Sequence, residues 1–97
     1  MTSSLAASPA GPPEPDRLSV VFAVYADAGP DVMPRVLEQF AKRNLVPARW
    51  YSNVVAGAAS ELQIDIRVDG LDRQAAQFIA RSLEALVNVQ QVIVGRG

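Results

Sequence analysis

The chain has 97 residues, of which 49% are hydrophobic and 20% charged, and its net charge is −1. This length accommodates one folded domain, and the nearly balanced charge argues against a nucleic-acid binder, which concentrates positive charge. Because the sequence contains neither Cys nor His, disulfides, thiolate or imidazole catalysis and Cys/His metal sites are excluded.

The first sixteen residues differ in composition from the rest of the chain. Residues 1–16 hold four of the seven prolines and three serines, with few bulky apolar groups. Such a segment buries too little surface to offset its chain entropy. We therefore predict a disordered tail over residues 1–16 and one folded domain over residues 17–97. The absence of a long apolar run predicts no membrane span and no signal peptide, hence a cytoplasmic protein.

The folded part begins with a strand and a helix. Residues 18–26 (LSVVFAVYA) are rich in β-branched and aromatic residues and contain no Gly or Pro, which predicts a central strand that is apolar on both faces. Residues 27–30 (DAGP) are a turn signal, and Asp31 is the predicted N-cap of the helix that follows. The predicted buried stripe of that helix, at spacing i, i+3, i+4 and i+7, consists of Met33, Val36, Leu37 and Phe40.

Two further strands follow. Residues 42–44 place two cations in the expected last helical turn, and then an asparagine that can adopt a left-handed conformation. An extended stretch runs over residues 47–54, and residues 56–59 (AGAA) form the predicted hairpin loop. Residues 61–69 (ELQIDIRVD) alternate strictly, which predicts a strand with one buried and one solvated face. Gly70 is expected to end this strand.

A second helix and a fourth strand complete the domain. The helix is predicted to start near Asp72, and the final strand covers residues 89–95 (VQQVIVG). The apolar residues expected on one side of the helix are Leu71, Ala75, Phe78, Ile79, Leu83 and Leu86.

The order β-α-β-β-α-β predicts an α+β fold, the ferredoxin-like two-layer sandwich with a four-stranded antiparallel sheet and two helices on one face. One sheet face then stays uncovered, although the central strand carries Val21, Ala23 and Tyr25 on the side opposite Val20 and Phe22. Exposed apolar surface of this kind marks a partner interface. We therefore predict a homodimer or a higher oligomer.

No residue pattern predicts catalysis or a metal site. The serines lack a histidine that could activate them. Asp65 and Asp69 share one strand face and could hold a hard cation, but a solvated face beside Arg67 explains them better. Trp50 and Tyr51 could stack on a base, yet adjacent strand residues point to opposite faces, which disfavours RNA binding.

The connection between the first strand and the first helix is the best candidate binding site. It joins a strand end, the Gly29-Pro30 turn and a helix start, whose free backbone N–H groups suit a carboxylate. The same residues also fit a plain turn before a helix, and on physical grounds alone this simpler interpretation is favoured over a carboxylate site.

The order of elements and three short runs resemble those of ACT domains, small regulatory modules that bind amino acids at subunit interfaces. Two runs are residues 29–37 (GPDVMPRVL) and 40–45 (FAKRNL). The third, residues 83–92 (LEALVNVQQV), resembles the end of the short, single-ACT form of the acetolactate synthase small subunit. The resemblance covers about residues 18–95.

This resemblance implies a non-catalytic regulatory subunit of branched-chain amino-acid biosynthesis that has no cofactor of its own. It would dock to or activate a thiamine-diphosphate-dependent catalytic large subunit and respond weakly to a small amino-acid effector such as valine. The implied effector site comprises Ala28, Gly29, Pro30, Asp31, Val32 and Met33, with Val46 and Pro47 opposite. The alternative is a stand-alone ACT-like metabolite-sensing or assembly protein with no synthase partner.

Overall fold

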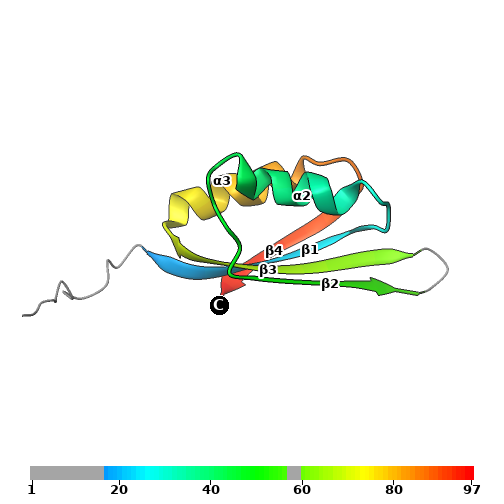
Figure 1. Ribbon diagram of the computed structural model, residues 1–97, viewed down its shortest axis with the longest axis horizontal. Coiled ribbons are helices and arrows are strands. Elements are labelled where there is room, and N and C mark those ends of the chain that lie inside the picture. The colour runs from blue at the N-terminus through cyan, green and yellow to red at the C-terminus, as the bar shows by residue number, and fades with distance from the viewer. Residues whose placement is uncertain (1–16, 57–59) are drawn as a thin grey trace, which may run out of the picture.

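A computed structural model of the chain describes residues 17–56 and 60–97. The predicted tail over residues 1–16 and most of the predicted 56–59 loop lie outside the described residues. The elements of this part of the chain follow in the predicted order (Figure 1): β1 Leu18–Asp27, α2 Val32–Ala41, β2 Arg49–Val55, β3 Glu61–Leu71, α3 Arg73–Glu84 and β4 Val89–Arg96.

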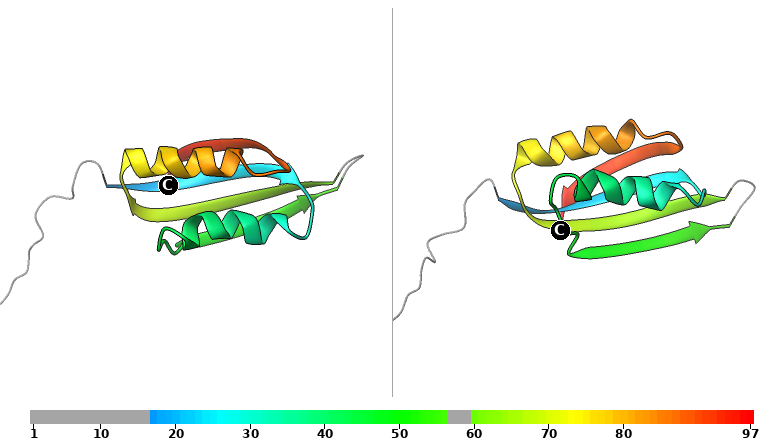
Figure 2. Two further views of the ribbon diagram at one scale, coloured as in Figure 1. Left: turned by 90° about the horizontal axis from the view of Figure 1, so that it is seen from above. Right: turned by 45° about the horizontal axis from the view of Figure 1, so that its top comes forward.

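The strands form one antiparallel four-stranded sheet in the order β2-β3-β1-β4. β1 is therefore central, as predicted, and β2 and β4 are the edge strands. Both helices lie on the same face of the sheet, α2 over β2 and β3 and α3 over β1 and β4 (Figure 2). This arrangement follows from the right-handed crossover that each β-α-β unit requires. The predicted ferredoxin-like sandwich is confirmed.

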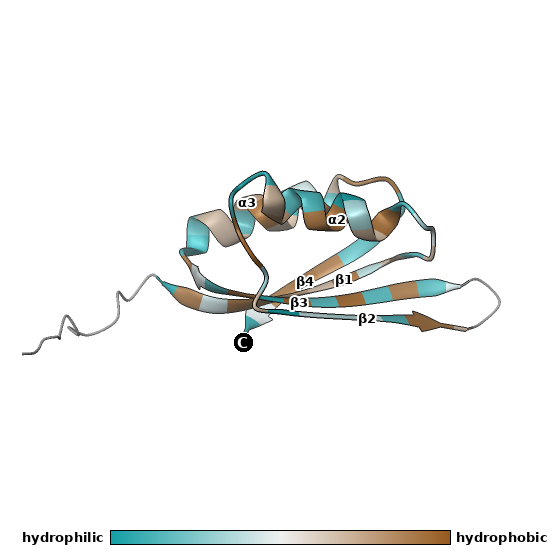
Figure 3. Ribbon diagram, in the orientation of Figure 1, coloured by the Kyte–Doolittle hydropathy of each residue, from teal (hydrophilic) through white to brown (hydrophobic). Residues whose placement is uncertain are grey.

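The core lies between the sheet and the helices and is built from alternate residues of β1 and β3. The alternation along β3 is visible as bands of hydropathy in Figure 3. Phe22 of β1 and Phe40 of α2 are fully buried and meet edge to face, with ring centroids 5.5 Å apart. The buried strand residues are Val20, Phe22, Val24 and Ala26 of β1 and Leu62, Ile64, Ile66 and Val68 of β3.

The buried side of α2 differs from the predicted stripe. Val32, Val36 and Phe40 are buried, but Met33 is 37% and Leu37 44% exposed. Successive helical residues turn by about 100°, so Met33 and Leu37 fall on the flank of the helix rather than beneath it. α2 itself lies over β2 and β3 at one edge of the sheet, beyond which the described chain has no further strand or helix that could cover an exposed flank.

The end of α2 also lies earlier than predicted, because the helix stops at Ala41 and Lys42 is its C-cap. Arg43 nevertheless satisfies a carbonyl in the last turn of α2, because its Nη1 donates to the Gln39 carbonyl at 2.7 Å. Its Nη2 donates to the Ser82 hydroxyl of α3 at 2.9 Å, which links the two helices. Asn44 has φ +59°, the predicted left-handed conformation.

The second helix is placed correctly but one of its predicted core residues is wrong. Asp72 is the N-cap and its carboxylate accepts from the Ala75 amide at 2.7 Å. The buried face is formed by Ala76, Ile79 and Leu83, and Phe78, about 100° away from Ile79, is 54% exposed.

Gly70 lies inside β3 rather than ending it. Leu18 pairs with Leu71 and Val20 with Val68, so β3 carries one extra residue at this point. Gly70 takes φ +77°, which a glycine adopts without a steric penalty. Because the extra residue is absorbed in this bulge, Leu71 still pairs with Leu18 and the strand extends to Leu71.

Candidate functional site

The β1–α2 connection is held by backbone hydrogen bonds that use several of its amides. The Ala28 N–H donates to the Ser60 carbonyl at 3.3 Å, and the Gly29 N–H to the Asp27 carbonyl at 2.9 Å. The Val32 N–H, the first of α2, donates to the Gly29 carbonyl at 3.2 Å. These bonds tie the loop to the start of β3 and fold it tightly before the helix.

Two backbone N–H groups at the start of α2 have no hydrogen-bond acceptor within the described residues. Pro30 and Pro34 have no N–H, and the Arg35 N–H is used by the Asp31 carbonyl at 3.3 Å. Within residues 17–56 and 60–97, the N–H groups of Asp31 and Met33 have no acceptor. Both lie at the positive end of the helix dipole, so the loop offers two donors to an anionic group.

The Asp31 carboxylate lies beside these donors. Asp31 occupies the predicted N-cap position but makes no side-chain capping hydrogen bond, because its backbone is helical (φ −91°, ψ −6°) instead of extended. Its carboxylate instead pairs with the Arg35 guanidinium, with Nε and Oδ2 3.2 Å apart. The site therefore carries an exposed, partly compensated negative charge next to the two free amides.

Close packing in the turn leaves little room for a side chain at Gly29. A Cβ atom there would lie 3.1 Å from Asp31 Oδ1 and 3.7 Å from Val32 Cγ2. The turn is also anchored to β4, because the Asp27 N–H donates to the Asn88 carbonyl at 2.8 Å and the Asp27 carboxylate accepts from Gln90 Nε2. These contacts tie the turn to β4 and place Gly29 directly beside the Asp31 carboxylate.

The structure places the predicted site residues in two separate groups. Ala28 to Met33 lie before and at the start of α2, whereas Val46 and Pro47 follow its other end. The ten residues of α2 separate the two groups by about 15 Å. Val46 is 85% exposed. One copy of the chain therefore does not bring both groups together.

The uncovered face of the sheet carries Asp69 and Tyr51, which the sequence offered as candidates for binding a cation and for stacking on a base. Asp69 Oδ1 accepts from Arg67 Nε at 3.0 Å and from the Ser19 hydroxyl at 2.8 Å. These bonds lower the pKa of Asp69, the Ser19 hydrogen bond contributing most. Trp50 packs against the core, whereas Tyr51 points to the uncovered face, as predicted. A shallow hollow of about 510 Å³ on this face is lined by Val21, Arg49, Tyr51, Asp65, Arg67 and Gly97.

Two classes of function find no support in the part of the chain that the structure describes. Among residues 17–56 and 60–97, no three Asp or Glu side chains group closely enough to hold a metal ion. No helix in these ranges is both long and apolar enough to cross a bilayer.

Which amides stay free at the start of α2 could not be predicted from the sequence. The answer depends on carbonyl acceptors from Asp27, Gly29 and Ser60, which the fold of the loop brings into place. The two prolines were the only advance signal, since they remove two of the possible donors.

The fold defines the class to which this chain belongs, that of small ferredoxin-like modules with a four-stranded antiparallel sheet and two helices on one face. A family model described as an ACT-like domain matches residues 14–96. The chain therefore belongs to the ACT-like domain family, which confirms the predicted resemblance at the level of the family.

Solved structures support the same fold. The ACT domain from GTP pyrophosphokinase of Chlorobium tepidum is similar in its crystal structure, with a TM-score of 0.68 and 8% identity over 81% of this chain and 99% of that one. Its solution structure gives 0.68 and 7% over 84% and 90%. The C-terminal domain of the MgtC protein from Mycobacterium tuberculosis gives 0.63 and 9% over 87% and 92%. No curated protein matches the sequence.

Proposed function

We propose that this chain is a non-catalytic regulatory module that binds a small apolar amino acid at the start of α2, in a site completed by a second copy. The observation that carries this proposal is the pair of unused N–H groups at Asp31 and Met33. They would hold the carboxylate of the effector. The Asp31 carboxylate beside them would hold its ammonium group, so a zwitterion fits the site better than a simple acid.

The second copy is inferred from the exposed flank of α2. α2 lies over β2 and β3, with α3 on its other side (Figure 2), and we infer that the exposed Met33 and Leu37 face away from α3, toward the β2 edge. On the same side of β2, Val54 is 58% exposed. Together these residues form an apolar surface, which we call the α2–β2 flank, defined by Met33, Leu37 and Val54. Exposed apolar surface beside an unpaired edge strand favours self-association.

A two-fold dimer through the α2–β2 flank would complete the effector site. A two-fold axis perpendicular to α2 would place the two copies of this helix side by side and antiparallel. The start of α2 in one copy then lies near the end of α2 in the other, where Val46 and Pro47 of the partner subunit would supply an apolar wall. Both copies of α2 have the same ten-residue length, so the start of one helix lies level with the end of the other when the two pack side by side. This wall favours an aliphatic side chain, and valine is the first ligand to test.

Isothermal titration with matched ligands tests the effector site. Valine should bind, and 3-methyl-2-oxobutanoate, which has the same carbon skeleton but no ammonium group, should bind at least about tenfold more weakly. Asp31→Asn should weaken valine binding and reduce this difference. Glu38→Gln, which removes an exposed charge further along α2, is the matched control and should change neither. Equal binding of the two ligands, or no effect of Asp31→Asn, would contradict the proposed site.

The partner proposed first is the thiamine-diphosphate-dependent catalytic chain of acetolactate synthase, from the resemblance in residues 29–37 and 83–92. The cofactor would belong to that chain. A dimer through the α2–β2 flank leaves the uncovered sheet face, with Val21, Ala23 and Ile93, available for docking. Purified catalytic chain should co-elute with this protein and gain activity on its addition. Neither co-elution nor a change in activity would favour the stand-alone sensing or assembly protein.

A further inference from the structure

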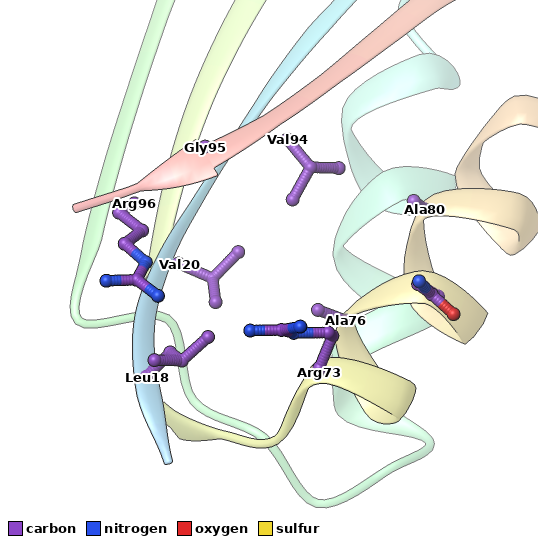
Figure 4. A pocket seen from close by; sticks show the side chains of 9 residues that line it. Leu18, Val20, Arg73, Ala76, Ala80, Val94, Gly95 and Arg96 are labelled. Atoms are coloured by element: carbon purple, nitrogen blue, oxygen red, sulfur yellow. The ribbon is translucent and has the colours of Figure 1, made fainter. Parts of the chain in front are cut away.

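A second cavity lies on the other side of the molecule, between α3 and the edge strand β4 (Figure 4). Its volume is about 300 Å³, at the lower end of the range for small-molecule sites. The walls are almost entirely apolar. Its lining is formed by Leu18 and Val20 of β1, Ala76 and Ala80 of α3, and Val94 and Gly95 of β4, with Arg73, Gln77 and Arg96 around the opening.

The cavity has a simple cause in the sequence. α3 presents Ala76 and Ala80, one helical turn apart, toward β4, where larger side chains would fill the gap. Gly95 adds only backbone to the lining, because its neighbours Val94 and Arg96 are the β4 residues that pair with the buried Phe22 and Val20 on the helix side of the sheet. Because β4 is an edge strand, no further strand in the described chain closes the space from the side.

The opening of the cavity is positively charged. Figure 4 shows Arg73 reaching from α3 over the apolar wall and Arg96 on the strand side of the same space. Among residues 17–56 and 60–97, neither guanidinium takes part in a hydrogen bond or an ion pair. No acidic side chain lines the cavity. Arg73 is also the first residue of α3, a position where the helix dipole disfavours a cation.

We propose that this cavity binds a small amphipathic carboxylate that lacks an ammonium group, with its aliphatic chain between α3 and β4 and its carboxylate between Arg73 and Arg96. Guanidinium groups bind carboxylates through paired, charge-assisted hydrogen bonds. An α-amino acid would bring an ammonium group to two cations with no carboxylate to receive it, and so would be rejected. The α3–β4 cavity thus selects against the ligands proposed for the α2 loop, and it does not depend on that site.

Three ligands with the same six-carbon chain test how a carboxylate and an ammonium group each affect the affinity for the cavity. Hexanoate should bind at least about tenfold more tightly than hexanamide, which keeps the shape without the charge. It should also bind more tightly than 2-aminohexanoate, which adds the ammonium group. Two-dimensional NMR should locate the bound acid by shifts of the Ala76, Ala80 and Gly95 amides. Equal affinity for acid and amide, or shifts elsewhere in the molecule, would overturn the proposal.

Variants test the two halves of the cavity separately. Arg73→Gln and Arg96→Gln should each weaken hexanoate binding about tenfold, whereas Arg81→Gln, an exposed arginine on the same helix outside the cavity, should not. Ala80→Leu should abolish binding by filling the space. Because Ala80 is partly exposed, that variant should still fold, which circular dichroism can verify. Unchanged binding in folded Ala80→Leu would contradict the site, and valine binding at the α2 loop should persist in all four variants.

Discussion

At the level of single residues, the uncovered sheet face contains a polar cluster that lowers the pKa of Asp69. The hydrogen bonds from Ser19 and Arg67 stabilise the ionised form of Asp69, which is why its pKa is lowered. A carboxyl group whose pKa is lower in the folded state contributes stability above its unfolded pKa. That contribution is lost as the pH falls through the folded value. The stability that this cluster contributes is therefore present at neutral pH and is lost only in the acid range, below about pH 4.

We predict that Ser19→Ala raises the pKa of Asp69, because it removes the hydrogen bond that contributes most to the shift. The carboxyl carbon of Asp69, followed by NMR across the acid range, would report the change. Ser52→Ala, on the opposite side of β2 from this cluster, is the control and should leave the Asp69 titration unchanged. An unaltered curve for Ser19→Ala would show that Arg67 alone sets the pKa.

Two helical phenylalanines give a direct test of the core. Phe40 is fully buried against Phe22, whereas Phe78 projects from α3 and is 54% exposed. Phe40→Ala should lower the free energy of unfolding by about 3–5 kcal/mol, through lost burial and the cavity left behind. Phe78→Ala should lower it by less than about 1 kcal/mol. Urea unfolding of both variants measures the difference, and similar losses would contradict the assigned helix faces.

At the level of elements, the two helices begin with the same residue type in different conformations. Asp72 has an extended backbone and caps the Ala75 amide, whereas Asp31 is helical and caps nothing. Asp72→Ala should therefore lower the free energy of unfolding by about 1 kcal/mol. Asp31→Ala removes only an exposed pair with Arg35 and should cost about 0.5 kcal/mol or less. Thermal unfolding of the two variants decides this, and equal losses would mean that Asp31 also caps its helix.

The strands of this fold were easier to predict from the sequence than the buried faces of its helices. The alternation in residues 61–69 and the apolar residues 18–26 predicted the two inner strands, because burial on a strand depends only on residue parity. The helix faces were less predictable, since Met33 and Phe78 are apolar residues at helical spacing that the finished sheet does not cover. Spacing along one helix cannot show how far its neighbours extend. The α3–β4 cavity was missed for the same reason, because it needs residues of three elements.

At the level of the whole molecule, the two helices divide the domain into two potential binding regions. α2 leaves two amides and an exposed apolar flank on the β2 side, and α3 leaves an apolar cavity with two arginines on the β4 side. Their charges are opposite, since Asp31 lies in the first and Arg73 and Arg96 in the second. The two proposed sites would together distinguish amino acids from simple acids by where they bind.

The last prediction connects assembly with ligand binding. Leu37 belongs to the α2–β2 flank but not to the loop before α2, so Leu37→Glu should break the dimer without touching the bound ligand in its own copy. If the partner subunit's Val46 completes the site, the same variant should also weaken valine binding, as titration would show. Sedimentation at micromolar concentration should give a monomer.

Ile93→Glu places the same charge on the uncovered sheet face, at a residue of similar exposure, and is the matched control. It should leave both the dimer and valine binding intact, because the proposed two-fold contact lies on the helix side of β2. If Ile93→Glu dissociates the dimer and Leu37→Glu does not, the copies associate through the uncovered face. The partner subunit's Val46 then cannot reach the loop, because that contact joins the sheets on the side away from the helices.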